Sequence, residues 1–219
     1  MARNRRDRCL DWCSAVWTAG LLAVLGFGVI NLVTTGKTLW MIPTPAVGQW
    51  VDFGNTEPKI NGNQFTFPPD TSATAGYFYT KPVGAVAPNM TATLNYTVTG
   101  SSDFQQTPQS GQSGDVNPAT ITLFIWRQGD DLSCHGAFAS HRMWAAKRNL
   151  VVGANQVISA PLIYNNWTNC YGQYDPTGFL STLQNLLGIG FTFGGQNFNG
   201  HGVYNPGGAG FIIEGFTVK

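Results

Sequence analysis

The feature that most constrains this chain is an uncharged stretch near its N-terminus. Residues 12–33 read WCSAVWTAGLLAVLGFGVINLV. Because an α-helix rises about 1.5 Å per residue, roughly twenty apolar residues are enough to cross a hydrocarbon core of about 30 Å. Residues 1–11 are rich in arginine, and the positive-inside rule places such a flank in the cytoplasm. We therefore expect a single membrane-spanning anchor, with the rest of the chain outside the cytoplasm.

A cleaved signal peptide is the alternative explanation of the same stretch. Such peptides have a shorter apolar region of roughly 7–15 residues and a small-x-small cleavage site. Here the apolar run is longer, and the sequence that follows it, TTGKTLWMIPTP, contains no Ala-x-Ala. The pattern favours an uncleaved signal anchor, followed by a short tether over residues 34–48 that contains Pro43 and Pro45.

The anchor carries small residues at helical spacing. Ala15, Ala19 and Ala23 recur every four residues, so they share one face of a helix. Small side chains let membrane helices approach one another closely, which predicts docking against other transmembrane subunits. The alternative is that alanine and glycine are simply common in membrane helices. The lipid bilayer is a partner of this segment in either case.

Residues 49–219 are long enough to form one domain with a substantial hydrophobic core. The whole chain is 11% charged with a net charge of +1, and its basic residues concentrate before the anchor. Such a charge distribution leaves no electrostatic footprint for nucleic acid. Low charge also suggests that a partner covers part of the surface, although Thr, Asn and Gln solubilise a surface equally well.

Short strands separated by turns dominate the pattern in this domain. Thr91–Thr99 alternates most clearly, with apolar residues at the even positions, which predicts a sheet with one solvated face. Gln49–Phe53 and Asn63–Phe67 flank Asn61-Gly62, which predicts a hairpin. Further strands are expected at 76–80, 120–127, 143–147, 149–152, 156–162, 190–194 and 211–218, with loops at 100–117 and 195–210.

One helix is expected late in the domain. Asp175 suits an N-cap, and Pro176 suits the first helical position. An apolar stripe at helical spacing follows, and Gly188 can end the helix. The stripe consists of Phe179, Leu180, Leu183, Leu186 and Leu187.

These elements together predict a mainly β protein. An N-terminal single transmembrane helix is followed by a jelly-roll type β-sandwich with one short helix. An immunoglobulin-like sandwich is the alternative. Its Cys–Trp–Cys arrangement is not matched, because the two cysteines of the outer domain lie in turn-like surroundings.

Cys134 and Cys170 are the two cysteines of the outer domain. Because oxidation is possible outside the cytoplasm, we expect a disulfide between them that closes a loop of about 36 residues. A metal site that includes His135 and His141 is the alternative. No CxxC or HxxxH spacing supports a metal site.

The C-terminal third carries a resemblance in three segments, APLIYNNWTNCYG, FLSTLQNLLGIGFTFGG and HGVYNPGGAGFIIEGFTVK. A loop with tryptophan precedes a short helix, a glycine-rich strand follows, and a last strand ends the domain. This order resembles galactose-binding-like jelly-roll domains, a plan shared by carbohydrate-binding modules and many uncharacterised exported bacterial domains. The resemblance implies the fold, and it carries over no set of ligand residues.

Catalytic motifs are not found in the sequence. It has no G-x-S-x-G elbow, P-loop or dinucleotide fingerprint, and its acidic residues fall in no paired-carboxylate motif. His201 lies between two glycines, which leaves its imidazole accessible, although such a histidine is more often structural. We expect no enzyme and no cofactor. The one metal considered is a structural Ca²⁺ at Asp130 and Asp131.

Binding has better candidate residues than catalysis. Trp167 and Tyr171 lie in a predicted loop, and Tyr204 lies in a Gly/Asn loop, so these rings can present flat faces to a sugar or a partner. Arg142 and His201 are polar candidates for the same contact surface. Two tryptophans in predicted strands are expected in the core instead, namely Trp126 and Trp144.

The favoured hypothesis is a non-catalytic accessory subunit of a larger inner-membrane complex, for example a respiratory or photosynthetic one. Its β-sandwich would cover the extracytoplasmic face of that complex. The alternative is a membrane-tethered carbohydrate-binding module of the cell envelope, and an unrecognised hydrolase ranks third. The arginine-rich anchor and the resemblance favour a bacterial inner membrane, with the C-terminal domain in the periplasm.

Overall fold

A computed structural model describes residues 50–53, 58–82, 85–106, 118–131 and 133–219. The segments predicted as cytoplasmic N-terminus, anchor and tether lie outside the described residues. The expected packing face of the anchor, Ala15, Ala19 and Ala23, lies outside them as well. Within the described ranges, no helix combines the length and the apolar character needed to cross a membrane.

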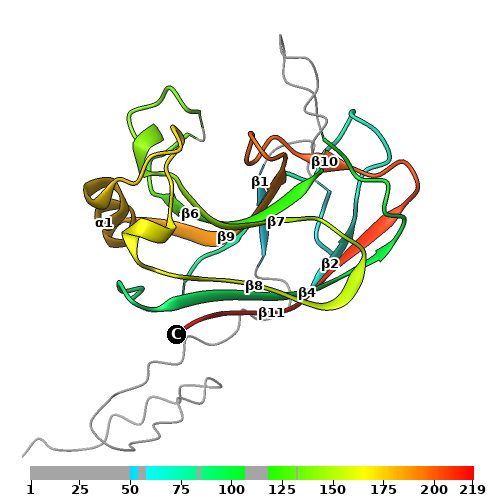
Figure 1. Ribbon diagram of the computed structural model, residues 1–219, viewed down its shortest axis with the longest axis horizontal. Helices are drawn as coiled ribbons and strands as arrows, with labels where there is room; N and C mark the ends of the chain where they lie inside the picture. The colour runs from blue at the N-terminus through cyan, green and yellow to red at the C-terminus, as the bar shows by residue number, and fades with distance from the viewer. Residues whose placement is uncertain (1–49, 54–57, 83–84, 107–117, 132) are drawn as a thin grey trace, which may run out of the picture. The chain divides into compact units, whose positions relative to one another are not determined.

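The described part is mainly β, with antiparallel sheets that face each other across one core (Figure 1). One sheet contains β1 (Val51–Phe53), β3 (Tyr77–Thr80), β6 (Thr120–Arg127), β7 (Met143–Asn149) and β9 (Leu186–Gly194). These five strands lie in the order β1-β3-β9-β6-β7.

The opposite sheet has four strands. It contains β2 (Gln64–Thr66), β4 (Thr91–Gly100), β8 (Gly153–Pro161) and β11 (Ala209–Val218), in the order β2-β11-β4-β8. A separate two-stranded pair joins β5 (Gln105–Gln106) to β10 (Val203–Tyr204). Both strands of this pair fall in segments that the sequence predicts as loops.

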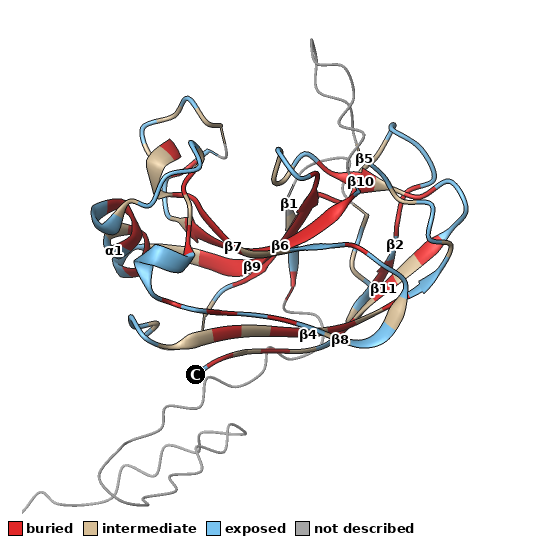
Figure 2. Cartoon of the chain, viewed as in Figure 1, coloured by how far each residue is buried: buried red, intermediate tan, exposed pale blue. Residues whose placement is uncertain are grey.

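Phenylalanine rings fill the space between the two large sheets. Phe65 of β2 stacks on Phe78 of β3 with ring centroids 4.5 Å apart, and on Phe211 of β11 at 5.3 Å. Phe191 of β9 stacks on the same two rings at 5.4 and 5.2 Å. Because these rings come from both sheets, their contacts hold the sheets together, and Figure 2 shows the buried residues facing one another across the core.

The predicted alternation in β4 is confirmed. Ala92, Leu94, Tyr96 and Val98 are at most 1% exposed, whereas the residues between them are partly exposed. β4 lies between β11 and β8, and its inward side chains meet those of the five-stranded sheet.

The predicted hairpin around Asn61-Gly62 is wrong in its strand pairing. β1 pairs with β3, and β2 pairs with β11, so the two flanking segments lie in opposite sheets. The dipeptide does turn the chain, since Gly62 has φ of 67° and Asn61 bridges to Gln64. Turn residues fix a local reversal, but the choice of partner strand depends on burial far along the chain.

Helix α1 (Pro176–Gln184) begins as the sequence predicts. The Asp175 carboxylate accepts a hydrogen bond from the Gly178 backbone N–H at 2.9 Å, which caps the helix. The helix ends before the predicted Gly188, because the chain from Leu186 onward pairs with β6 as part of β9. Two 3₁₀ turns complete the secondary structure, η1 (Ala139–His141) and η2 (Tyr164–Asn166).

Candidate functional site

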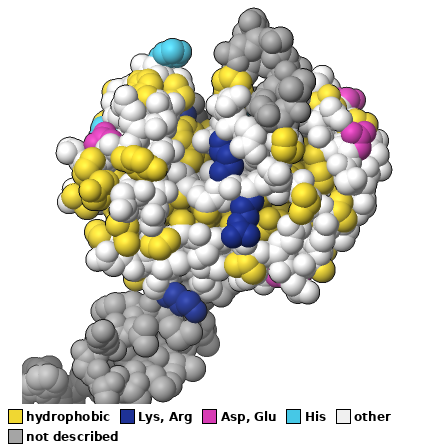
Figure 3. Space-filling view, in the orientation of Figure 1, with side chains coloured by type: hydrophobic (Ala, Val, Ile, Leu, Met, Phe, Trp, Pro, Cys, Tyr) yellow, Lys and Arg dark blue, Asp and Glu magenta, His cyan; other side chains and the backbone are white. Residues whose placement is uncertain are grey.

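The outer face of the five-stranded sheet carries an open cleft with a volume of about 1000 Å³. Three loops border this outer cleft: residues 129–138 after β6, 168–173 after η2 and 195–201 after β9. The sheet curves between loops that rise on both sides of it (Figure 1). Figure 3, in the same orientation, shows apolar and neutral polar side chains with few charged ones among them.

An aromatic layer lies beneath the cleft. Edge-to-face contacts join Tyr77 to Phe124 at 5.1 Å and Tyr79 to Trp126 at 4.9 Å. Strand β9 lies between the strands that carry these rings, and it has glycine at the positions over which the rings lie. A Cβ on Gly188 would lie 2.3 Å from Cδ2 of Tyr79, so only glycine lets that ring lie on the strand. Trp144 of β7 completes the layer.

A buried ion pair fixes the base of loop 129–138. Arg142 donates to the Asp130 carboxylate from Nε at 2.9 Å and from Nη2 at 2.6 Å, and both side chains are at most 2% exposed. Nη2 also donates to the Ser133 carbonyl at 3.2 Å, and the Trp126 indole N–H donates to the Asp130 carbonyl at 3.1 Å. A bidentate ion pair fixes the orientation of the two side chains as well as the distance between them, so the loop starts from a fixed position above the aromatic layer.

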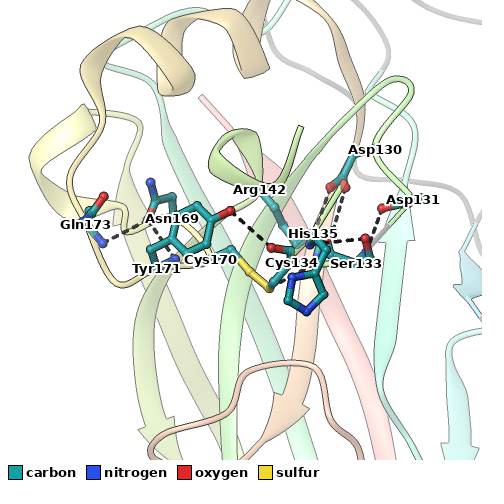
Figure 4. Close-up of a disulfide and its surroundings, with 10 residues drawn as sticks. All are labelled: Asp130, Asp131, Ser133, Cys134, His135, Arg142, Asn169, Cys170, Tyr171 and Gln173. Carbon is teal, nitrogen blue, oxygen red and sulfur yellow. Dashed lines mark hydrogen bonds and ion pairs between the residues drawn. A yellow bond between two sulfur atoms is a disulfide. The ribbon is translucent and has the colours of Figure 1, made fainter. Parts of the chain in front are cut away.

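A disulfide joins loop 129–138 to loop 168–173 (Figure 4). The Cα atoms of Cys134 and Cys170 are 5.9 Å apart, a separation that suits a disulfide. The Tyr171 hydroxyl donates to the Cys134 carbonyl at 3.2 Å and forms a second link between the loops. The two loops therefore act as a single wall of the cleft.

Loop 168–173 presents the Tyr171 ring at the rim of the cleft. The side-chain carbonyl of Asn169 accepts hydrogen bonds from the backbone N–H groups of Tyr171 and Gln173, each at 3.0 Å. The Asn169 backbone N–H donates in turn to the Gln173 carbonyl at 2.8 Å. The Tyr171 side chain is nevertheless 58% exposed. Its ring is a flat apolar surface that is already ordered before any ligand arrives.

Loop 195–201 forms the opposite wall, and its path depends on Gly200. This residue has φ of +78°, and a Cβ on it would lie 1.8 Å from the Tyr77 hydroxyl oxygen. Lys147 of β7 donates to the carbonyls of Gly195 and Gln196 at 3.4 and 2.5 Å. These contacts tie the loop to the sheet below it.

Two titratable groups of the cleft have shifted pKa values. Hydrogen bonds from the backbone and side chain of Ser133 lower the pKa of Asp131, which keeps this carboxylate charged at neutral pH. The His201 ring packs edge-on against Phe198 at 5.4 Å, and the partial burial lowers its pKa below the usual 6.5. The imidazole is therefore neutral at pH 7.

Two polar atoms of residues that line the cleft are buried without a hydrogen-bond partner among the described residues. They are Nε1 of Trp144 and Oδ1 of Asn199. An unpaired buried donor or acceptor costs about 1–3 kcal/mol. The fold thus leaves one donor and one acceptor unpaired beneath the surface of the cleft.

The candidates from the sequence lie in different places. His201 lines the cleft, whereas Tyr171 lies at its rim, between the lining residues Cys170 and Gly172. Arg142 also lines the cleft, but it is 1% exposed and its guanidinium binds Asp130. Tyr204 lies in β10 and is not among the residues that line the cleft.

Trp167 is not on the surface, which corrects the expectation from its loop position. Its side chain is fully buried, its ring lies 6.4 Å from that of Phe179 in α1, and its indole N–H donates to the Pro161 carbonyl at 2.8 Å. A short loop that crosses the end of a sandwich can contribute to the core, so loop position alone did not predict exposure.

Sequence reasoning missed most of the cleft-lining residues. Trp144 is buried as expected, yet in the layer under the cleft rather than between the sheets. Asn199 belongs to a Gly/Asn-rich loop whose composition could have marked a polar wall. For the considered Ca²⁺ site, the Asp130 carboxylate is engaged by Arg142, and the described ranges hold no cluster of three His, Cys, Asp or Glu suited to a metal ion.

Comparison of the chain with protein-family models, with curated proteins and with solved structures finds no match. Function must therefore be argued from the cleft and its surroundings.

Proposed function

We propose that this protein is a glycan-binding module with a jelly-roll domain, tethered to a membrane and binding its sugar in the outer cleft. The observation that carries the proposal is the exposed ring of Tyr171, held rigidly beside a cleft rich in neutral amide and hydroxyl groups. A sugar combines an apolar C–H face with hydroxyl groups. Aromatic rings and neutral hydrogen-bonding side chains match both features.

The strand order supports a jelly-roll. Without the short β1, β5 and β10, the strands β2-β11-β4-β8 face β3-β9-β6-β7. The late strand β11 lies between β2 and β4, and β9 lies between β3 and β6. Two Greek keys wound together give such interleaving, and lectin domains are among the proteins built in this way.

The low charge of the cleft favours a neutral glycan. The buried charges of Arg142 and Asp130 satisfy each other, and the rest of the cleft offers mainly amides, hydroxyls and rings. Residues 12–33 would hold the module in a bacterial inner membrane, with the domain in the periplasm.

A tyrosine substitution tests the proposal. Full-length protein in mild detergent is screened against a glycan array, and affinity for the best ligand is measured by calorimetry. Tyr171→Ala is expected to weaken binding about three- to tenfold, the equivalent of 0.5–1.5 kcal/mol for a lost aromatic contact. Tyr171→Phe keeps the ring and is expected to cost less.

Tyr174→Ala is the matched control, since Tyr174 is 61% exposed but neither of its chain neighbours lines the cleft, whereas both neighbours of Tyr171 do. Equal losses from Tyr171→Ala and Tyr174→Ala would place binding elsewhere. A correctly folded protein that retains no glycan on the array would refute the proposal.

An accessory subunit of an inner-membrane complex is the second candidate function. The exposed apolar side chains of Ile163, Tyr164 and Leu180 favour it, because a partner protein would cover them. Extraction in mild detergent, native-gel separation and mass spectrometry test this candidate. A stoichiometric set of co-migrating membrane proteins is expected if the protein is a subunit, and migration alone would exclude that role.

A further inference from the structure

The disulfide between Cys134 and Cys170 lies at the surface of the outer cleft. Both cysteines line the cleft and neither of them is buried, so thiols in solution can approach the bond. The bond joins the two loops of one cleft wall, as Figure 4 shows. A disulfide that is accessible in this way is open to exchange with thiols, unlike a disulfide enclosed in a core.

The two loops are also fastened to the sandwich without the disulfide. Trp144 of β7 and Thr168 exchange two backbone hydrogen bonds, at 2.9 and 3.0 Å, which hold the base of loop 168–173. The buried pair of Asp130 and Arg142 holds the base of loop 129–138. Opening the disulfide therefore removes a link between the loops and leaves the pairing of the strands and both loop bases in place.

A cation lies beside one of the two sulfur atoms. Arg142 binds Asp130 through Nε and Nη2, while its Nη1 points at Sγ of Cys134, 4.0 Å away. A thiolate on Cys134 would accept a charge-assisted hydrogen bond from this guanidinium, whose charge Asp130 offsets only in part. Cys170 instead packs against the aromatic layer, and apolar surroundings disfavour a thiolate. The two sulfur atoms are thus unequal as leaving groups.

We propose that this disulfide is a thiol-exchange site, which a dithiol reduces while the sandwich stays folded, so that the two loops of the cleft wall can move independently. A thiolate of the dithiol attacks Sγ of Cys170 and forms a mixed disulfide, and the electron pair of the broken S–S bond leaves on Cys134. The second thiolate of the dithiol attacks its own sulfur in the mixed disulfide and releases Cys170. With both cysteines counted as thiols, the protein gains two electrons and two protons, which the dithiol loses as it becomes a disulfide.

Reduction also affects the ring at the rim of the cleft. The hydrogen bond from the Tyr171 hydroxyl to the Cys134 carbonyl remains, but a neutral hydrogen bond is too weak to hold two loops together on its own. The reduced protein must then order the ring when a ligand arrives, which weakens binding. This effect on glycan affinity rests on the proposed function, whereas the thiol exchange does not.

Thiol trapping and hydrogen exchange test the site in the full chain, in mild detergent, with Cys9→Ser and Cys13→Ser. Dithiothreitol at millimolar concentration is expected to free both remaining cysteines for a maleimide label without urea. Backbone hydrogen exchange, followed by mass spectrometry, should then rise several-fold more in residues 129–138 and 168–173 than in β4 and β9. Reduction only in urea, an equal rise in β4 and β9, or no rise in the two loops would overturn the proposal.

Two further measurements test the direction of attack and the wall. Glutathione, a monothiol, is expected to form its mixed disulfide on Cys170, and an adduct mainly on Cys134 would refute the proposed order. Tyr171→Phe removes the second link between the loops and should speed reduction by dithiothreitol several-fold, whereas Tyr174→Phe, the matched control, removes an exposed hydroxyl outside the cleft. Equal rates in these two variants would overturn the account of the wall.

Calorimetry with the best array glycan separates this inference from the proposed function. The reduced protein is expected to bind that glycan several-fold more weakly than the oxidised protein, and equal affinities would show that the disulfide does not control the cleft. If the oxidised protein binds no glycan at all, the proposed function fails, while trapping and hydrogen exchange still decide whether the disulfide is a thiol-exchange site.

Discussion

Breaking the Asp130–Arg142 pair tests how the outer cleft is held. Arg142→Met removes the guanidinium and leaves the Asp130 side chain fully buried without the two hydrogen bonds that Arg142 donates to it. Removing one partner of a buried pair typically costs about 3–5 kcal/mol. A domain of this size has roughly 5–15 kcal/mol of total stability, so the loss is a large share of it.

The double variant Asp130→Leu with Arg142→Met separates burial from pairing. Apolar residues in place of both charges are often neutral for stability, but the Ser133 carbonyl loses its donor here, at a cost of about 1–3 kcal/mol. We expect the double variant to be more stable than Arg142→Met alone. Urea denaturation of the full chain in mild detergent, followed by tryptophan fluorescence, measures the free energies of unfolding. A loss below about 1 kcal/mol for Arg142→Met, or strict additivity of the two single changes, would refute the reasoning.

Three shorter predictions follow from other contacts. Phe211→Ala removes the ring that stacks on Phe65 in its own sheet and on Phe191 across the sandwich, and it should lower the free energy of unfolding by about 3–5 kcal/mol in urea denaturation, against under about 0.5 for Thr93→Ala on the outer face. Gly200→Ala should lower the melting temperature and weaken glycan binding together, because its Cβ meets the Tyr77 hydroxyl at a positive φ; normal values of both would contradict the account of this loop. The pKa of His201 is lower in the folded state than in the unfolded state, so below about pH 6.5 the unfolded state binds more protons. The contribution of His201 to the free energy of unfolding is therefore complete above that pH, and it is lost as the pH falls through the pKa of the folded state. The exposed position of the ring keeps the effect small, and His201→Gln should remove it from a pH series of unfolding free energies.

The sequence was most informative where one element determines its own geometry. The alternation of Thr91–Thr99 fixed which face of β4 is buried, because a period of two cannot satisfy both faces. The start of α1 at Asp175-Pro176 was also predicted correctly, since an N-cap and a first-turn proline act within one helical turn. The pairing of the strands could not be predicted from the sequence. Asn61-Gly62 specifies a turn, while the pairing of β2 with β11 depends on rings some 150 residues later in the chain.

The candidate site was harder to predict because its residues share no motif. Tyr171 and His201 could be singled out by their loop positions, but Tyr77 and Gly200 matter only through contact with each other. For Trp167, the prediction of surface exposure from its loop position was wrong. Its loop passes over the end of the core, and hydrogen bonding of its indole to Pro161 allows complete burial of a residue that local composition marks as exposed.

The low charge of the chain can be explained without a partner protein that covers the whole domain. On the outer face of the four-stranded sheet, Thr93 and Ser159 share a hydrogen bond at 2.9 Å and Thr97 bonds Glu214 at 2.5 Å. Hydroxyl groups therefore make that face hydrophilic although it carries few charges. Exposed apolar side chains lie at several places, among them Val151 and Val152 between β7 and β8, Leu180 of α1, and Tyr171 at the rim of the outer cleft. Tyr171→Ala should weaken glycan binding, whereas Leu180→Asp, outside the residues that line the cleft, should leave glycan affinity unchanged. Equal loss of affinity in both variants, measured by calorimetry, would mean that the outer cleft is not the binding site.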